Sequence, residues 1–176
     1  MSPLILDNVL SSAEVLDIER VMRTPYFPWY IQEYTASGTC VDPRFKDTPF
    51  ISHSFISRGS HSSYAPLANK VVSTLEQVVE EKYKIDRAIG AATFKSSDKF
   101  ITPPHIDMDI DHKVLIYYVN DNDGQTIFYK PETNFEELMR VDVKAGRFVL
   151  FDGRLYHSAV TCTNSNYRII INFNLL

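Results

Sequence analysis

The sequence is poor in cysteine and glycine and has no long apolar run. Its two cysteines, Cys40 and Cys162, cannot form a disulfide framework and predict a reducing compartment. The 6 glycines among 176 residues exclude a collagen-like chain. No apolar run approaches the roughly 18 residues of a membrane span, and the N-terminus lacks the basic and apolar regions of a secretory signal. We therefore expect a soluble, cytoplasmic protein with no membrane partner.

An excess of positive charge is also missing. The chain has 18 basic and 22 acidic residues, and the formal net charge of −4 argues against a protein that coats nucleic-acid phosphates. A hydrophobic share of 44% with 23% charged residues is typical of a globular chain and excludes a disordered one. Because no repeat, low-complexity tract or linker interrupts the sequence, we expect a single domain over residues 1–176.

Helical patterns occur in the first half of the chain. Ser11 and Glu14 have the spacing of a capping box, and the helix that they open is expected to end before Pro25 and Pro28. A second helix is predicted from about Pro66 to Tyr83. Expected to face inward are Val15, Ile18, Val21, Met22, Leu67, Val71, Leu75, Val78 and Val79. Expected to face water on the second helix are Glu76, Glu80 and Lys82.

Short β-type runs replace the helical pattern after residue 85. One earlier strand is also expected. The predicted strands are Phe50–Ile56, Ala88–Lys95, His105–Asp109, Lys113–Val119, Thr126–Tyr129, Arg147–Phe151, His157–Val160 and Tyr167–Leu175. Helices followed by many short strands predict a mainly β fold, a sandwich or barrel with flanking helices. Residues 1–85 would then form a helical N-terminal support with substrate-side elements, and residues 86–176 the β core.

A possible metal site comes from two parts of the β region. His105 and Asp107 are two residues apart, so on a strand both side chains would lie on one face while Ile106 points away. His157 follows a hydrophobic run about fifty residues further along the chain. Two imidazoles and one carboxylate form the facial triad that holds non-haem Fe(II). Arg168, on the last predicted strand, supplies a planar fork suited to a carboxylate.

In this order the motifs resemble those of the Fe(II)/2-oxoglutarate-dependent dioxygenases, in particular the prolyl-hydroxylase-like group. The resemblance covers about residues 88–175, and Asp123 stands where the family's turn has its first glycine. The segments that carry it are His105-Ile-Asp107, Ile116-Tyr-Tyr-Val-Asn120, Asp123-Gly-Gln-Thr-Ile-Phe128, Ala145-Gly-Arg-Phe-Val-Leu-Phe151, His157 and Arg168.

The resemblance implies a double-stranded β-helix (a jelly-roll, cupin-like fold) and a hydroxylase. Fe(II) would be held by the two histidines and Asp107, and 2-oxoglutarate by Arg168 with Tyr118 and Thr126. O2 would be the second cosubstrate, with succinate and carbon dioxide as products. Related halogenases replace the carboxylate ligand, so Asp107 favours hydroxylation. The implied prime substrate is a peptidyl proline, another protein side chain or a small amino-acid-like molecule.

Other interpretations stay open at this point. Taken singly, the His105–Asp107 pair could be exposed, His157 a core histidine and Arg168 a surface arginine. A cupin-like metal-binding or sensing module without turnover would share the same ligands. A nucleic-acid demethylase is less favoured, because that branch carries a second arginine where Asn174 stands here.

Several other polar or aromatic residues are candidates of lower weight. Asp109 and Asp111 share the alternation of His105 and Asp107 and could compete as ligands. His53, His61 and His112 are expected on the surface or in loops, although His53 could border the pocket. The aromatic residues Tyr26, Phe27, Trp29, Tyr30 and Tyr34 are expected to pack in the core, with a substrate-facing lid as the alternative.

Overall fold

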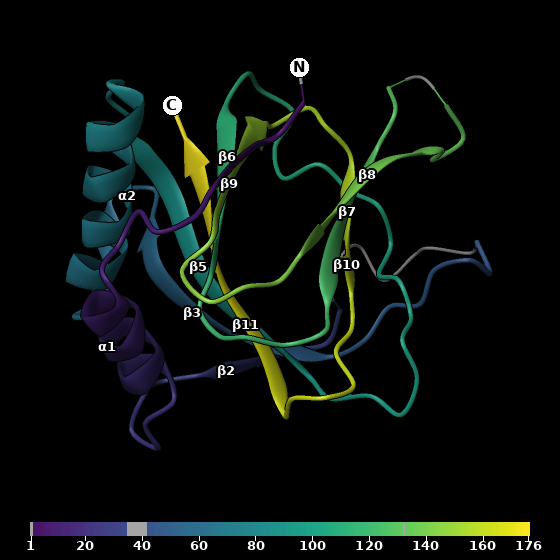
Figure 1. The fold of residues 1–176 in the computed structure, drawn as a ribbon, viewed down its shortest axis with the longest axis horizontal. Coiled ribbons are helices and arrows are strands. Elements are labelled where there is room, and N and C mark those ends of the chain that lie inside the picture. Colours follow the sequence, from purple (N-terminus) through teal and green to yellow (C-terminus); the bar gives the residue numbers. More distant parts are fainter. Residues whose placement is uncertain (1, 35–41, 132) are drawn as a thin grey trace.

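The computed structural model describes residues 2–34, 42–131 and 133–176, which form two β-sheets and two helices (Figure 1). Cys40 lies outside the described residues. In chain order the elements are β1 (Leu4–Leu6), α1 (Ser12–Met22), β2 (Tyr30–Gln32), β3 (Phe50–Ser57), β4 (Ser60–His61), α2 (Ala65–Val79), β5 (Ile85–Phe94), β6 (Lys113–Tyr118), β7 (Gln125–Tyr129), β8 (Glu137–Asp142), β9 (Phe148–Asp152), β10 (His157–Val160) and β11 (Tyr167–Leu175).

The two sheets face each other, and both helices cover the outer face of the larger one (Figure 1). The larger sheet has the order β1-β9-β6-β11-β5-β3-β2, with β4 paired to β3, and the smaller sheet has the order β10-β7-β8. All strand pairings among the described residues are antiparallel. From β6 to β11 the chain passes repeatedly from one sheet to the other, so the space between the sheets is enclosed by residues of both.

The helices match the sequence prediction in place, with corrections on α2. Ser11 caps α1, and its side chain and that of Glu14 satisfy each other's backbone N–H groups as a capping box. α2 ends at Val79, because Glu80 takes a left-handed conformation with φ 56°, so the predicted extension to Tyr83 is wrong. No helix within the described ranges is long and apolar enough to span a membrane.

Two side chains of α2 were assigned to the wrong environment. Val78, expected inside, is 50% exposed. Glu76, expected to face water, is 12% exposed, because it accepts hydrogen bonds from the Lys82 ammonium and the Tyr83 N–H. The residues that follow α2 thus fold back onto Glu76, whereas Val78 stays exposed.

The strand predictions hold for most of the β region and fail at residues 105–109. In that segment His105 forms one isolated bridge to His157, and no continuous strand follows. Pro103 and Pro104 explain the interruption, since proline has no N–H to donate to a ladder. The sequence analysis also missed β1, β2, β4 and β8. Together with the predicted β3, the first three of these mean that residues 1–85 supply four strands of the larger sheet as well as both helices.

The larger sheet separates two hydrophobic clusters. The helix-side cluster lies between this sheet and the helices, and the interior cluster lies between the two sheets. On β5 the positions that face the helices are small, namely Ala88, Gly90 and Ala92. A Cβ at Gly90 would lie 2.9 Å from Met22 Cε and 3.0 Å from a ring carbon of Phe55, so glycine allows α1 to approach the sheet closely.

Candidate active site

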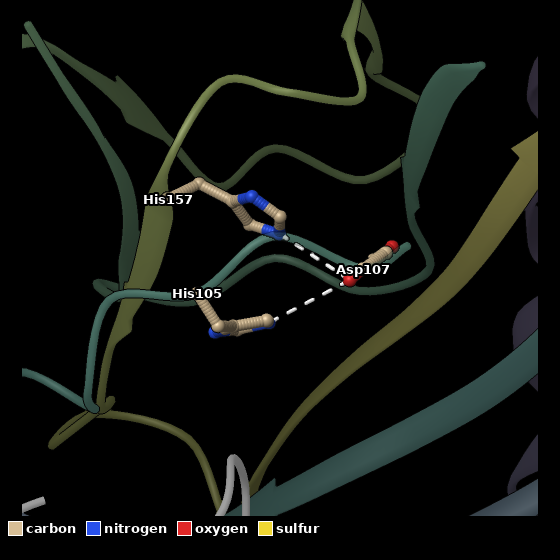
Figure 2. Close-up of side chains that lie close together, drawn as sticks. All are labelled: His105, Asp107 and His157. Atoms are coloured by element: carbon tan, nitrogen blue, oxygen red, sulfur yellow. Dashed lines mark ion pairs between the residues drawn. The ribbon is translucent and has the colours of Figure 1, made fainter. Parts of the chain in front are cut away.

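His105, Asp107 and His157 converge at one point between the sheets (Figure 2). The backbone N–H groups of His105 and His157 donate to each other's carbonyl at 3.1 and 3.0 Å, which places the two rings 4.6 Å apart. Asp107 Oδ1 lies 3.7 Å from His105 Nε2 and 3.9 Å from His157 Nε2. One ligand atom from each residue falls within 4.8 Å of the others. The two-residue spacing thus brings His105 and Asp107 together from a loop and not from a strand.

The ring orientation of both histidines is fixed by backbone carbonyls. The Nδ1 atoms lie 3.1 Å from the Pro103 carbonyl oxygen for His105 and 3.2 Å from that of Leu155 for His157. A carbonyl can only accept, so each Nδ1 carries the proton and each Nε2 presents its lone pair. This is the tautomer that a metal ligand needs.

Asp107 is held from the side opposite the histidines. Its Oδ2 accepts hydrogen bonds from the amide nitrogens of Asn172 and Asn174, both at 2.8 Å, while Oδ1 faces the rings. Sequence reasoning missed both asparagines as site residues. Their alternation with Arg168 along β11 was the signal that could have found them, because residues 168, 170, 172 and 174 share one face of a strand.

Burial and neighbouring charges set the protonation of the site. Burial, followed by the nearby His105, lowers the pKa of His157 to about 4, so its ring is neutral at pH 7. Burial raises the pKa of Asp107, but the two histidines and the two asparagine amides outweigh it and hold this pKa below its ordinary value. A neutral imidazole beside a carboxylate anion is the ligand state for a divalent cation.

Arg168 lies deeper in the same cavity with only 3% exposure. One of its terminal nitrogens donates to Thr126 Oγ1 at 2.9 Å, and the Tyr118 hydroxyl donates to the same oxygen at 2.6 Å. Tyr118 belongs to the interior cluster, whereas Tyr117 belongs to the helix-side cluster. The structure therefore brings Arg168, Thr126 and Tyr118 together.

These groups share a cavity of about 660 Å³. The metal candidates, Arg168 and Thr126 line it, together with Arg87 from β5. Apolar side chains make up much of the remaining wall, among them Phe45, Phe50, Ile89, Pro103, Pro104, Ile116, Phe135 and Ile170. The volume is in the range of small-molecule sites, and polar groups on an apolar wall are their usual composition.

The other candidates from the sequence lie elsewhere. Asp109 and Asp111 do not join the ligand cluster, and Asp111 pairs with Arg154 at 2.8 Å. His53 is 4% exposed and does not line the cavity, so its surface placement was wrong. Its ring nitrogens contact the Pro28 carbonyl and the Ser62 hydroxyl. His112 is buried but lies in a loop, which is one of the two expected placements, and His61 is exposed on the surface.

The N-terminal aromatic stretch divides between core and surface. Phe27 is buried against Trp29, His53, Phe55 and Tyr64. Tyr26, Tyr30 and Tyr34 are exposed at 87%, 62% and 52%, so the prediction that they pack in the core is wrong for these three residues. None of these five aromatic residues lines the cavity.

The residues present fit a metal ion and an anionic cosubstrate. Two imidazole nitrogens and a carboxylate oxygen are a donor set suited to Fe(II). The Arg168 guanidinium is buried, its Nε has no partner, and no carboxylate within the described residues pairs with it. A buried cation is costly without an anion, so this position suits the carboxylate of a ligand.

A scan against protein-family models and a search of curated protein sequences found no match. Solved structures do match. An oxidoreductase of the 2OG-Fe(II) oxygenase family from Burkholderia pseudomallei aligns with a TM-score of 0.69 at 10% identity, over 98% of this chain and 84% of that one. A prolyl hydroxylase from Trichoplax adhaerens, in complex with a hypoxia inducible factor peptide fragment, aligns with a TM-score of 0.63 at 17% identity. The alignment covers 99% of this chain and 83% of that one. HygX from Streptomyces hygroscopicus, with nickel and 2-oxoglutarate bound, aligns with a TM-score of 0.64 at 14% identity, over 98% of this chain and 82% of that one.

The predicted fold is thereby confirmed. The chain is mainly β, with helices on one sheet, and has the double-stranded β-helix architecture of the 2OG-Fe(II) oxygenases, prolyl hydroxylases included.

Proposed function

We propose that this protein is an Fe(II)- and 2-oxoglutarate-dependent dioxygenase that hydroxylates its substrate. The observation that carries the proposal is the coexistence, in one cavity, of the His105–Asp107–His157 cluster and the buried cation of Arg168, which pairs with no carboxylate of the described residues. Solved structures with the same architecture, one of which holds nickel and 2-oxoglutarate, support it.

Each residue group has a defined task in this proposal. His105, Asp107 and His157 would hold Fe(II), and Asn172 and Asn174 fix Asp107 by hydrogen bonds to its Oδ2, leaving Oδ1 towards the two rings. Arg168 and Thr126 bind the distal carboxylate of 2-oxoglutarate, and Tyr118 orients Thr126. The apolar walls limit access of water to the site. Bound iron would supply the redox chemistry that couples O2 to oxidation of 2-oxoglutarate and substrate.

A peptidyl proline, another protein side chain or a small amino-acid-like molecule is the proposed prime substrate. The prolyl hydroxylase from Trichoplax adhaerens was solved with a peptide fragment, which supports the first of these. Asn174 occupies the place of the second arginine of nucleic-acid demethylases and donates to Asp107 here, which disfavours that substrate class.

The proposal is tested by turnover. The protein is purified anaerobically, loaded with Fe(II) and 2-oxoglutarate, and exposed to O2, and succinate is measured. We expect succinate from the wild type, none from His157→Ala, and strongly reduced formation from Arg168→Ala, whose metal stays bound. His61→Ala, at an exposed histidine outside the cavity, is the matched control and should behave as wild type. Candidate peptides and amino acids are then screened by mass spectrometry for the gain of one oxygen atom.

A metal-binding or sensing module without turnover is the second candidate function, because it would use the same ligands. It predicts metal and 2-oxoglutarate binding with no succinate at any O2 concentration. Succinate formation that depends on His157 excludes it.

A further inference from the structure

A second arginine, Arg87, lines the cavity at the other end of the same sheet face. Strands β5 and β11 pair so that Arg168 lies opposite Thr93 and Arg87 lies opposite Asn174. Six residues of extended strand separate the two ends, a distance of ~20 Å at ~3.4 Å per residue. Of the metal candidates, Asp107 lies towards the Arg87 end, since it is hydrogen-bonded to Asn172 and Asn174.

Most of the Arg87 guanidinium is available to a ligand. Its Nε donates to Asn174 Oδ1 at 2.7 Å, which is a neutral acceptor. The nearest carboxylate oxygen is Asp107 Oδ2 at 3.8 Å, too far for a hydrogen bond, and that oxygen already accepts from two amides. The Arg87 side chain is 35% exposed, so its terminal nitrogens can still be reached.

Among the described residues, the only carboxylate paired with Arg87 is Asp107, whose charge the loaded site would already use. A divalent iron, the Asp107 carboxylate, the two carboxylates of 2-oxoglutarate and the Arg168 guanidinium cancel one another. Asp42, the other acidic residue of the cavity lining, is paired with Arg44 at 2.6 Å. Counted over the described lining residues, the cavity therefore carries one positive charge in excess, at the end away from Arg168.

We propose that Arg87 binds a carboxylate of the prime substrate, which is therefore an anion with an apolar body. This inference rests on the proposed function. Arg87 can form a two-point contact with a carboxylate through its terminal nitrogens, which make no hydrogen bond within the described residues. The apolar lining of the cavity contacts the rest of the molecule. The carboxylate could belong to a free small acid or to an acidic side chain of a peptide, and the experiment separates these sources.

The test is calorimetric binding to the protein loaded with Ni²⁺ and 2-oxoglutarate, where no turnover is needed. The first probes are phenylacetate and phenylacetamide, which differ in charge and not in size. The second pair is a blocked tripeptide with a central glutamate and its glutamine counterpart. We expect one acid to bind about ten- to hundred-fold more tightly than its amide, the effect of a charge-assisted hydrogen bond. The acid that shows this preference identifies the source of the carboxylate.

Two variants assign the preference to Arg87. Arg87→Gln should abolish it while changing the Ni²⁺ and 2-oxoglutarate affinities less than about twofold, and Arg87→Lys should retain part of it. Equal binding of acids and amides by the wild type overturns the inference, as does a preference that survives Arg87→Gln. A parallel loss of Ni²⁺ affinity in Arg87→Gln would make Arg87 only a positioning residue for Asp107. Failure of the wild type to bind Ni²⁺ and 2-oxoglutarate in the loading step would instead contradict the proposed function.

Discussion

Tyr117 and Tyr118 are adjacent in the sequence and lie on opposite faces of β6. The Tyr118 hydroxyl donates to Thr126 beside Arg168, whereas the Tyr117 hydroxyl is buried with no hydrogen-bond partner in the described part of the chain. Tyr118→Phe should weaken 2-oxoglutarate binding about tenfold, because Thr126 loses the bond that orients it. Tyr117→Phe should leave binding unchanged and raise the free energy of unfolding by about 1 kcal/mol, since it removes an unsatisfied hydroxyl. Calorimetry and urea unfolding measure the two effects, and the reverse ranking would contradict both assignments.

Asn174 is the second position where a single side chain decides a property of the site. It donates one of the two hydrogen bonds that hold Asp107 Oδ2. Asn174→Ala should lower Ni²⁺ affinity about ten- to hundred-fold, the usual effect of removing a group that orients a metal ligand. The exposed Asn166, at the turn before β11, offers the control Asn166→Ala, which should bind as the wild type does. Equal affinities in the two variants would show that Asn172 alone suffices to orient Asp107.

At the scale of elements, an ion pair fixes the N-terminal edge strand. Asp7, directly after β1, accepts hydrogen bonds from Arg147 beside β9 at 2.8 and 2.9 Å. These bonds, with a smaller effect of Lys144, lower the pKa of Asp7 from 3.8 to about 2. The stabilisation is therefore complete above about pH 4 and is lost as the pH falls through about 2.

Asp7→Asn should lower the free energy of unfolding by about 1 kcal/mol at pH 7, given that the pair is partly exposed. The difference from the wild type should shrink between pH 4 and pH 2. Urea unfolding across this range measures it. A difference that is independent of pH would mean that the Asp7 carboxylate does not contribute through its charge.

The elements also show what the sequence could and could not predict. Strands such as β6 and β11 were found because they are runs of β-branched and aromatic residues, buried over most of their length. β8 was missed because it is a largely exposed edge strand rich in charged residues, with Val141 as its buried position. The proximity of His105 and Asp107 was predicted for the wrong reason, since Pro103 and Pro104 prevent the strand and a loop produces the same juxtaposition. Arg87 could not be recognised at all, because the pairing that aligns it with Asn174 joins residues far apart in the chain.

At the scale of the whole molecule, a metal ion at this site would connect the two sheets. His157 lies on β10 of the smaller sheet and is bridged to His105, whereas Asp107 is tied to β11 of the larger sheet. An ion held by all three should therefore stabilise the entire fold. At a Ni²⁺ concentration of about 100 times Kd the gain is ~2.7 kcal/mol.

For a chain of this length that gain raises Tm by about 5–10 °C. Thermal unfolding of the wild type with and without Ni²⁺ measures it. His157→Ala should remain folded and lose the shift, and His61→Ala should keep it. A full shift in His157→Ala would remove His157 from the ligand set.

The division of β5 between a helix-facing and a cavity-facing side has an evolutionary consequence. Gly90 meets Met22 and Phe55 so closely that a larger residue there would push α1 from the sheet. Ile89 and Ala91, on either side of Gly90, face the cavity. Replacing them would reshape the space offered to a substrate without disturbing the helix layer. A lineage can therefore acquire new substrate preferences by mutation at these two positions while the scaffold keeps its folding stability, whereas selection acts against most changes at Gly90.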